Sequence, residues 1–144
     1  MKFSVCLIAR NEAKVLPRLV ESLKEFMSRG GEICLCDTGS TDGTAELARS
    51  LGCKVKEVGT KFVHVITTAE ANAINERFIV ENEHPIVLPG ETYFDFASAR
   101  NEAVSMASND WICTVDADEI LTSLNLDKIN EIISNSNIGQ FRDF

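Results

Sequence analysis

Short apolar runs alternate with helical segments along the first 58 residues, and this alternation constrains the fold more than any other feature of the sequence. Residues 3–9 form a nearly continuous apolar run, typical of a strand covered on both faces. Residues 15–27 carry apolar side chains on one helical arc and charged ones on the other. A second strand is expected over 33–36, a helix over 41–51 and a third strand over 54–58. This order predicts right-handed βαβ units on a parallel sheet, and therefore an α/β fold.

The pattern is less regular between residues 60 and 93. Thr67 and Glu70 have the spacing of a capping box, which predicts a short helix ending near Arg77. Residues 85–89 are expected to form another short strand. This segment is interpreted as a lid or wall, or as a surface elaboration.

Regular elements resume after this segment. Residues 94–108 are expected to form a helix with Asp95 as its N-cap. A strand is expected over 111–115 and a last helix over 125–134. Residues 141–144 look like the start of a further strand. With no internal repeat or linker, residues 1–144 are expected to form part of a single domain.

The charge of the chain limits its partners. A formal net charge of −8 and a pI near 4.7 argue against a nucleic acid or an anionic membrane surface as partner. A polyanionic ligand would need placed Arg or Lys side chains, or a divalent cation held by carboxylates. No stretch approaches the roughly 18 to 20 apolar residues of a membrane span, so no integral membrane segment is expected.

The cysteines indicate a reducing environment. They are odd in number, lie in apolar runs and form no Cys-x-x-Cys pair, so we expect reduced core residues in a cytoplasmic protein rather than a zinc site or disulfide framework. They are Cys6, Cys34, Cys36, Cys53 and Cys113.

Two carboxylates follow the last expected strand, at Asp116 and Asp118. In a strand, side chains two residues apart share a face, so both would point into the crevice beyond the carboxyl ends of the sheet. Carboxylates about 5 Å apart repel by roughly 3 kcal/mol at an effective dielectric near 20, and a divalent cation reverses that sign. The pair predicts a Mg²⁺ or Mn²⁺ site; an acidic N-cap cluster or solvated turn is the alternative.

A second polar group follows the second expected strand, at residues 37–44. Gly39 permits a positive φ, and the hydroxyl and carboxyl side chains that follow it can cap the next helix. Asp37 lies one residue too early to be needed as a cap, so it is a candidate acceptor for a base N–H or a ribose hydroxyl. The segment matches neither a P-loop nor a dinucleotide-binding fingerprint.

Arg100 is a third candidate. It falls in the middle of the apolar arc of its expected helix, where a guanidinium is costly unless it is paired with an anion. The candidate partners are a ligand phosphate or base, Asp37, and either Asp116 or Asp118. A purely structural ion pair to one of these aspartates is the alternative.

Taken in order, these segments resemble the nucleotide-binding half of family 2 glycosyltransferases. The resemblance rests on Ala-Arg-Asn-Glu at 9–12, Asp-Thr-Gly-Ser-Thr-Asp at 37–42, Asp-Phe-Ala-Ser-Ala-Arg-Asn at 95–101, and Asp-Trp-Ile and Asp-Ala-Asp-Glu between 110 and 119. It covers nearly the whole chain except 60–93. It implies a GT-A fold, with an open, mostly parallel, Rossmann-like sheet that stops before the acceptor half.

The resemblance also implies a function. A metal-dependent inverting transferase would move a sugar from a nucleoside-diphosphate sugar, UDP- or dTDP-linked, to a hydroxyl of a glycan, lipid or protein acceptor. Mn²⁺ or Mg²⁺ would offset the charge that builds on the leaving diphosphate. The implied nucleotide-sugar-binding residues are Ala9, Arg10, Asn11, Glu12, Asp37, Arg100, Asp116 and Ala117.

Individual roles follow from the same resemblance. Asp37 would bind the edge of the base, and Arg100 the base or diphosphate. Asp116 would face the ribose and, with Asp118, the metal. The general base is expected beyond residue 144, and Glu119 is expected to be a capping residue or a neighbour of the metal ligands.

Two other functions compete with this hypothesis. A non-catalytic module would bind nucleotide sugars without turnover. A nucleotidyltransferase would also use acidic pairs with Mg²⁺, but it needs a glycine-rich basic loop after the first strand, which residues 10–13 are not.

Overall fold

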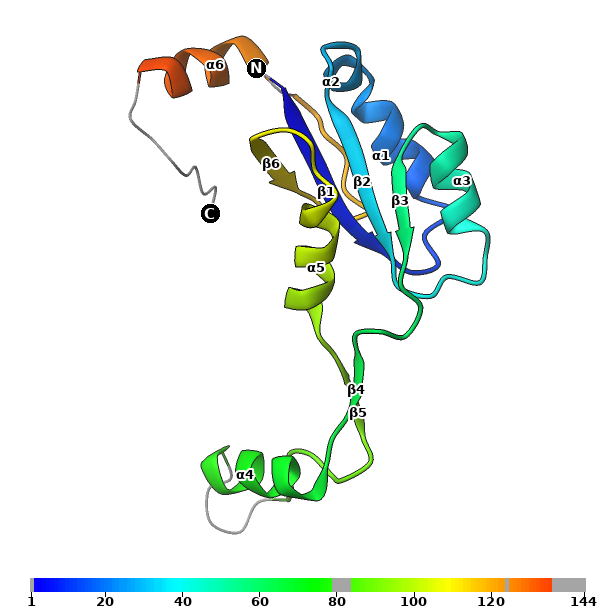
Figure 1. The fold of residues 1–144 in the computed structure, drawn as a ribbon, viewed down its shortest axis with the longest axis vertical. Coiled ribbons are helices and arrows are strands. Elements are labelled where there is room, and N and C mark those ends of the chain that lie inside the picture. The colour runs from blue at the N-terminus through cyan, green and yellow to red at the C-terminus, as the bar shows by residue number, and fades with distance from the viewer. Residues whose placement is uncertain (1, 79–83, 124, 136–144) are drawn as a thin grey trace.

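The computed structural model describes residues 2–78, 84–123 and 125–135 of the 144-residue chain. Its centre is a four-stranded parallel sheet of order β3-β2-β1-β6 (Figure 1). The strands are β1 (Phe3–Ala9), β2 (Glu32–Asp37), β3 (Lys54–Glu57) and β6 (Trp111–Thr114). The α/β class and the parallel sheet are therefore confirmed. The strand expected over 141–144 lies outside the described residues.

Helices cover both faces of the sheet (Figure 1). Because strand side chains alternate between faces, Val5 and Leu7 pack in one apolar cluster, while Cys6 and Cys34 pack in another. The first cluster includes side chains of α1 (Leu16–Ser22), α2 (Lys24–Ser28), α3 (Thr44–Ser50) and α6 (Leu126–Asn135). The second includes side chains of α5 (Phe96–Ser105). None of the described helices is long and apolar enough to cross a membrane.

Small side chains bring α5 close to the sheet. Ala99 and Ala103 are buried against the thiols of Cys6, Cys34 and Cys36. Burial raises the pKa of Cys6 to about 12 and that of Cys36 to about 11, so these thiols stay protonated.

The expectation that every cysteine is a core residue was wrong for Cys113. Cys113 is exposed because β6 is the edge strand of the described sheet, next to β1.

The single helix expected over 15–27 is two helices, α1 and α2, that meet at Leu23. The hydroxyl of Ser22 donates to the carbonyl of Leu19, and the amide of Leu23 is shared between two carbonyls at 3.2 Å each. Such side-chain and bifurcated bonds compete with the regular ladder and end a helix.

Helix α3 begins at Thr44 rather than at the expected Thr41. Gly43 has a left-handed φ of 85°, which the first turn of a helix does not accommodate. The carboxylate of Asp42 accepts hydrogen bonds from both the amide and the hydroxyl of Thr44. The turn before the helix is therefore held by Asp42.

The described residues 60–78 and 84–93 form an arm that extends beyond the carboxyl ends of the strands (Figure 1). Its stem is an antiparallel ribbon of β4 (Val63–Val65) and β5 (Thr92–Phe94), and α4 (Thr68–Phe78) lies at its far end. The capping box is confirmed, since the amide and hydroxyl of Thr67 donate to the carboxylate of Glu70 at 2.8 and 2.7 Å.

The strand expected over residues 85–89 is absent from the described part of the arm, so that prediction was wrong. The amides of Ile86 and Val87 donate to Oδ1 of Asn75, and Nδ2 of Asn75 donates to the carbonyl of Val87. The backbone is thus bound by a side chain of α4 instead of by a neighbouring strand.

The expected helix 94–108 is shorter, because residue 94 belongs to β5 and the helix ends at Ser105. Its N-cap is confirmed. Oδ1 of Asp95 accepts from the amide of Ser98 at 2.9 Å, and hydrogen bonds from the Ser98 hydroxyl and amide lower the pKa of Asp95.

Glu32 joins three strands at the amino-terminal end of the sheet. Its carboxylate accepts from the hydroxyl of Ser4 on β1 at 2.5 Å and from the amide of Ser108, and it pairs with Nζ of Lys54 on β3 at 2.5 Å. Burial alone would raise the pKa of Glu32, but the bonds from Lys54, Ser4 and Ser108 outweigh it and lower this pKa to about 2.

Glu32→Gln is expected to lower the free energy of unfolding by about 2 kcal/mol near neutral pH. The folded-state pKa lies below the ordinary 4.5, so this stabilisation is present above about pH 4.5 and is lost as the pH falls toward 2. Urea unfolding at several pH values measures the difference. Glu21→Gln is the matched control, because its pair with Lys24 is exposed and contributes under about 1 kcal/mol. A Glu32→Gln difference that stays constant through this window would contradict the assignment.

Candidate functional site

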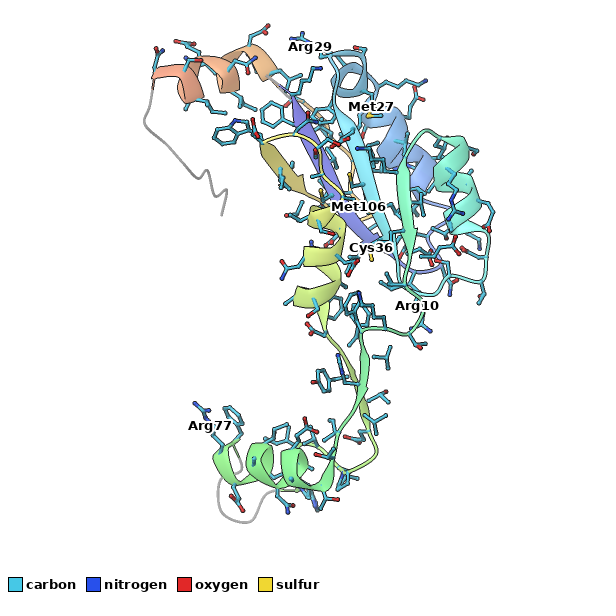
Figure 2. The ribbon with its side chains drawn as sticks, viewed as in Figure 1. Arg10, Met27, Arg29, Cys36, Arg77 and Met106 are labelled. Carbon is cyan, nitrogen blue, oxygen red and sulfur yellow. The ribbon has the colours of Figure 1, made fainter. Side chains whose placement is uncertain are left out.

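A cavity of about 580 Å³ lies at the carboxyl ends of the strands, where parallel α/β sheets bind ligands. Four parts of the chain line it: the end of β1 with the loop that follows, the residue after β2, the arm with the start of α5, and the segment after β6. The lining residues are Ile8, Ala9, Arg10, Glu12, Thr38, Val63, Thr92, Tyr93, Phe94, Phe96, Arg100, Asp116, Ala117 and Asp118. Figure 2 shows Arg10 at this end of the sheet, with Met27 and Arg29 at the opposite end.

Asp116 and Asp118 both line the cavity, as the sequence predicts, but they do so from a turn. Strand β6 ends at Thr114, and the amide of Glu119 donates to the carbonyl of Asp116 at 3.1 Å. The buried Ala117 between the two aspartates anchors the turn in the core. Oε2 of Glu119 accepts from the amide of Asp116 at 2.8 Å, so Glu119 caps this turn.

Arg100 pairs with Asp116. Nη2 of Arg100 donates to Oδ1 of Asp116 at 2.6 Å, and the two side chains are 36% and 57% exposed. Of the partners considered for this guanidinium, the structure therefore selects Asp116. Both charges face the cavity rather than the core, which removes the desolvation cost that a buried arginine would have.

Asp118 makes fewer side-chain interactions than Asp116. Its exposed side chain has no hydrogen-bond or ion-pair partner among the residues that the structure describes. The same part of the chain holds no cluster of three or more His, Cys, Asp or Glu side chains suited to a metal ion. Two carboxylates fit Mg²⁺ or Mn²⁺ only when water and ligand phosphates complete the coordination, which is the usual arrangement for Mg²⁺.

Asp37 lies at the end of β2, opposite Ala9 of β1, and is 2% exposed. Its Oδ1 accepts from the amides of Gly39 and Ser40 at 3.0 and 2.9 Å, so Asp37 has a local capping role, contrary to the expectation. Its Oδ2 is buried and has no hydrogen-bond partner within the part of the chain that the structure describes. Asp37 does not itself line the cavity, but the adjacent Thr38 does. A buried acceptor without a partner carries a desolvation cost.

Asn11 joins the loops after β1 and β2 and is absent from the cavity lining. Its amide donates to the hydroxyl of Ser40 at 2.9 Å, and its Oδ1 accepts from the amide of Thr41 at 2.8 Å. Asn11 has a positive φ of 59°, which directs the chain between the two cavity residues Arg10 and Glu12. The geometry therefore makes Asn11 a residue that positions its neighbours.

The arm residues that line the cavity are missing from the sequence-based candidates. Tyr93, Phe94 and Phe96 form a short aromatic run before Arg100, and the rings of Phe94 and Phe96 meet edge to face at 4.7 Å. That run was an available signal, but only the pairing of β5 with β4 brings it to the cavity.

Asn11→Ala is expected to destabilise the chain by about 2 kcal/mol, through loss of the bond to Thr41 and through the cost of a left-handed alanine. Asn11→Gly removes the same side chain without the backbone penalty, so its expected loss is about 1 kcal/mol. Urea unfolding of both variants measures this order. An alanine variant no less stable than the glycine variant would contradict the role of the backbone conformation.

A family model described as Glycosyl transferase family 2 matches residues 4–72 and 67–138. The chain is 32% identical over 118 residues to a TPR repeat-containing protein of Synechococcus elongatus, covering 82% of this chain and 21% of that protein. It is 28% identical over 140 residues to an uncharacterised glycosyltransferase of Rickettsia felis, covering 97% of this chain and 37% of that protein. The chain thus spans well under half the length of these relatives.

Solved structures share the fold. Residues 1–349 of S. aureus TarS in complex with UDP match with a TM-score of 0.59 and 21% identity, over 93% of this chain and 32% of that one. Mannosyl-3-phosphoglycerate synthase from Rubrobacter xylanophilus matches with a TM-score of 0.50 and 21% identity, over 82% of this chain and 31% of that one.

Proposed function

Because the chain belongs to glycosyl transferase family 2 and has its GT-A fold, we propose that residues 1–144 are the nucleotide-sugar-binding part of a metal-dependent inverting glycosyltransferase. The observation that carries this proposal is the shared cavity. Arg10, Glu12, Arg100, Asp116 and Asp118 come from separate segments and line one space at the carboxyl ends of the strands.

The proposed donor is a UDP- or dTDP-linked sugar. The TarS structure of the same fold is a complex with UDP, which supports a uridine donor. Within this chain, Asp37 lies next to the cavity residue Thr38, and its Oδ2 has no hydrogen-bond partner among the described residues, which supports an acceptor role toward the edge of a base. Arg10, Glu12 and Ala9 would line the base and ribose part of the cavity, with Asn11 holding their loop.

Asp118, with Asp116, would hold the Mn²⁺ or Mg²⁺. When bound, the ion neutralises charge that builds on the nucleoside diphosphate as it leaves. Arg100 adds a fixed positive charge and orients Asp116 through the 2.6 Å bond. In a chain of net charge −8, these groups supply the attraction that a diphosphate needs.

The acceptor is proposed to be a hydroxyl of a glycan, lipid or protein, and the protein is proposed to act in the cytoplasm. Inversion would follow from attack on the anomeric carbon opposite the departing diphosphate. The general base is proposed to lie outside these 144 residues.

Calorimetric titration of this chain with UDP, with and without MnCl₂, tests the proposal. Binding that strengthens with Mn²⁺ is expected. Sugar transfer is then assayed with UDP- and dTDP-sugars, using a protein that contains this chain and has the full length of its relatives. Turnover indicates a transferase, whereas a binding module would bind the sugars without turnover.

Asp118→Asn is expected to remove most of the Mn²⁺-dependent gain in UDP affinity, roughly tenfold or more, because a neutral amide binds a divalent cation poorly. Asp127→Asn is the matched control, since Asp127 is 82% exposed and pairs with Arg29, which lies at the opposite end of the sheet from Arg10 (Figure 2). Equal Mn²⁺ dependence in the wild type and Asp118→Asn would remove Asp118 from the metal site.

Asp37→Asn is expected to weaken UDP binding roughly tenfold while leaving the binding of Mn²⁺-pyrophosphate unchanged, because Asp37 is proposed to contact only the base. The bonds to Gly39 and Ser40 can be kept by the amide oxygen, so the turn is retained. Parallel losses for UDP and pyrophosphate would indicate a general disturbance of the loop.

A further inference from the structure

The stem of the arm and the start of α5 present aromatic rings beside the cavity. Tyr93, Phe94 and Phe96, here called the aromatic wall, all line it. Tyr93 is 48% exposed and Phe96 is 60% exposed. Large apolar rings left open to water beside a polar cavity are a common mark of a binding surface.

The rings are held in place. Tyr93 pairs with His64 across the β4–β5 ribbon, and the two rings stack with centroids 5.2 Å apart and planes inclined by 26°. Phe94 packs against the core cluster of α5 and meets Phe96 edge to face. A ring that is ordered before binding loses little conformational freedom when a ligand stacks on it.

The arm leaves the body beside Asp37. The amide of Val58 donates to the carbonyl of Asp37 at 2.9 Å, and a Cβ built on Gly39 would lie 3.5 Å from the backbone of Gly59. Phe62, at the foot of β4, is buried in the cluster that contains Cys36. The arm is therefore anchored next to the strand end proposed to bind the base edge.

The cavity is divided chemically. Arg100 and the two aspartates suit a cation-bridged diphosphate, whereas the aromatic wall suits a flat uncharged ring. A nucleobase needs both an edge contact and a face contact, and Asp37 is proposed to supply only the edge.

We propose that Tyr93 stacks on the face of the donor's nucleobase, making the arm a wall of the nucleotide site and a determinant of nucleotide affinity. This inference rests on the proposed function. It deepens that function by giving the inserted segment 60–93 a defined ligand contact.

The first test is calorimetric titration of this chain with UDP, UDP-glucose and pyrophosphate, each with MgCl₂. Tyr93→Ala is expected to weaken UDP and UDP-glucose equally, by roughly tenfold, and to leave pyrophosphate unchanged. Tyr93→Phe keeps the ring and is expected to bind within about twofold of the wild type. Phe78→Ala is the matched control, because Phe78 is an aromatic residue of the same arm, 60% exposed, and does not line the cavity.

A second readout is direct. Tyr93 is the sole tyrosine of the chain, so a sample with ring-labelled tyrosine gives signals from this residue alone. UDP with MgCl₂ is expected to shift them upfield through the ring current of the stacked base, whereas pyrophosphate with MgCl₂ leaves them in place.

The outcomes separate the two proposals. A wild type that binds no nucleoside diphosphate overturns the proposed function and this inference with it. A wild type that binds UDP, with Tyr93→Ala binding equally well, overturns the stacking alone. A loss confined to UDP-glucose would place Tyr93 on the sugar and also overturn base stacking.

Discussion

The parallel pairing of β1 with β2 is the interaction on which the candidate site depends. It places Ala9 directly opposite Asp37, so the loops that follow the two strands leave the sheet side by side. Side chains then join these loops. Asn11 bonds to Ser40 and Thr41, and the amide of Glu12 donates to the hydroxyl of Thr44 at 2.9 Å. Arg10 and Glu12 are thereby held at the cavity by a buried sheet rather than by a free loop.

The two faces of the sheet are packed differently. The α1–α3 side contains mostly leucine, isoleucine, valine and phenylalanine side chains, whereas the buried residues on the α5 side are alanines, thiols and Phe62. The alanines let α5 pack against β1 and β2, and α5 in this position brings Arg100 to Asp116. A larger residue at Ala99 would displace the helix that positions this arginine, because well-packed interiors do not absorb added volume without shifts.

The arm changes how the cavity is composed. The arm contributes Val63, Thr92 and Tyr93 to the cavity lining. The β4–β5 ribbon adds aromatic rings to the cavity on the side of Asp37. The base of this ribbon is fixed by the burial of Phe62 and by a hydrogen bond from the amide of Asp95 to the carbonyl of Phe62 at 2.8 Å. The distal helix α4 has no such role at the cavity; its capping box and the contacts of Asn75 serve its own end of the arm.

The sequence by itself determined the order of strands and helices along the body, the N-cap at Asp95, the capping box at Thr67 and the candidacy of Arg100, Asp116 and Asp118. These features follow from periodicity and from bonds between residues three or four apart, which a linear pattern records. Tertiary structure decided the ribbon of the arm, the partner of Arg100, the bridging role of Asn11 and the unpartnered oxygen of Asp37. Each of those depends on groups tens of residues apart meeting at one edge of the sheet, and no local pattern specifies which of them will meet.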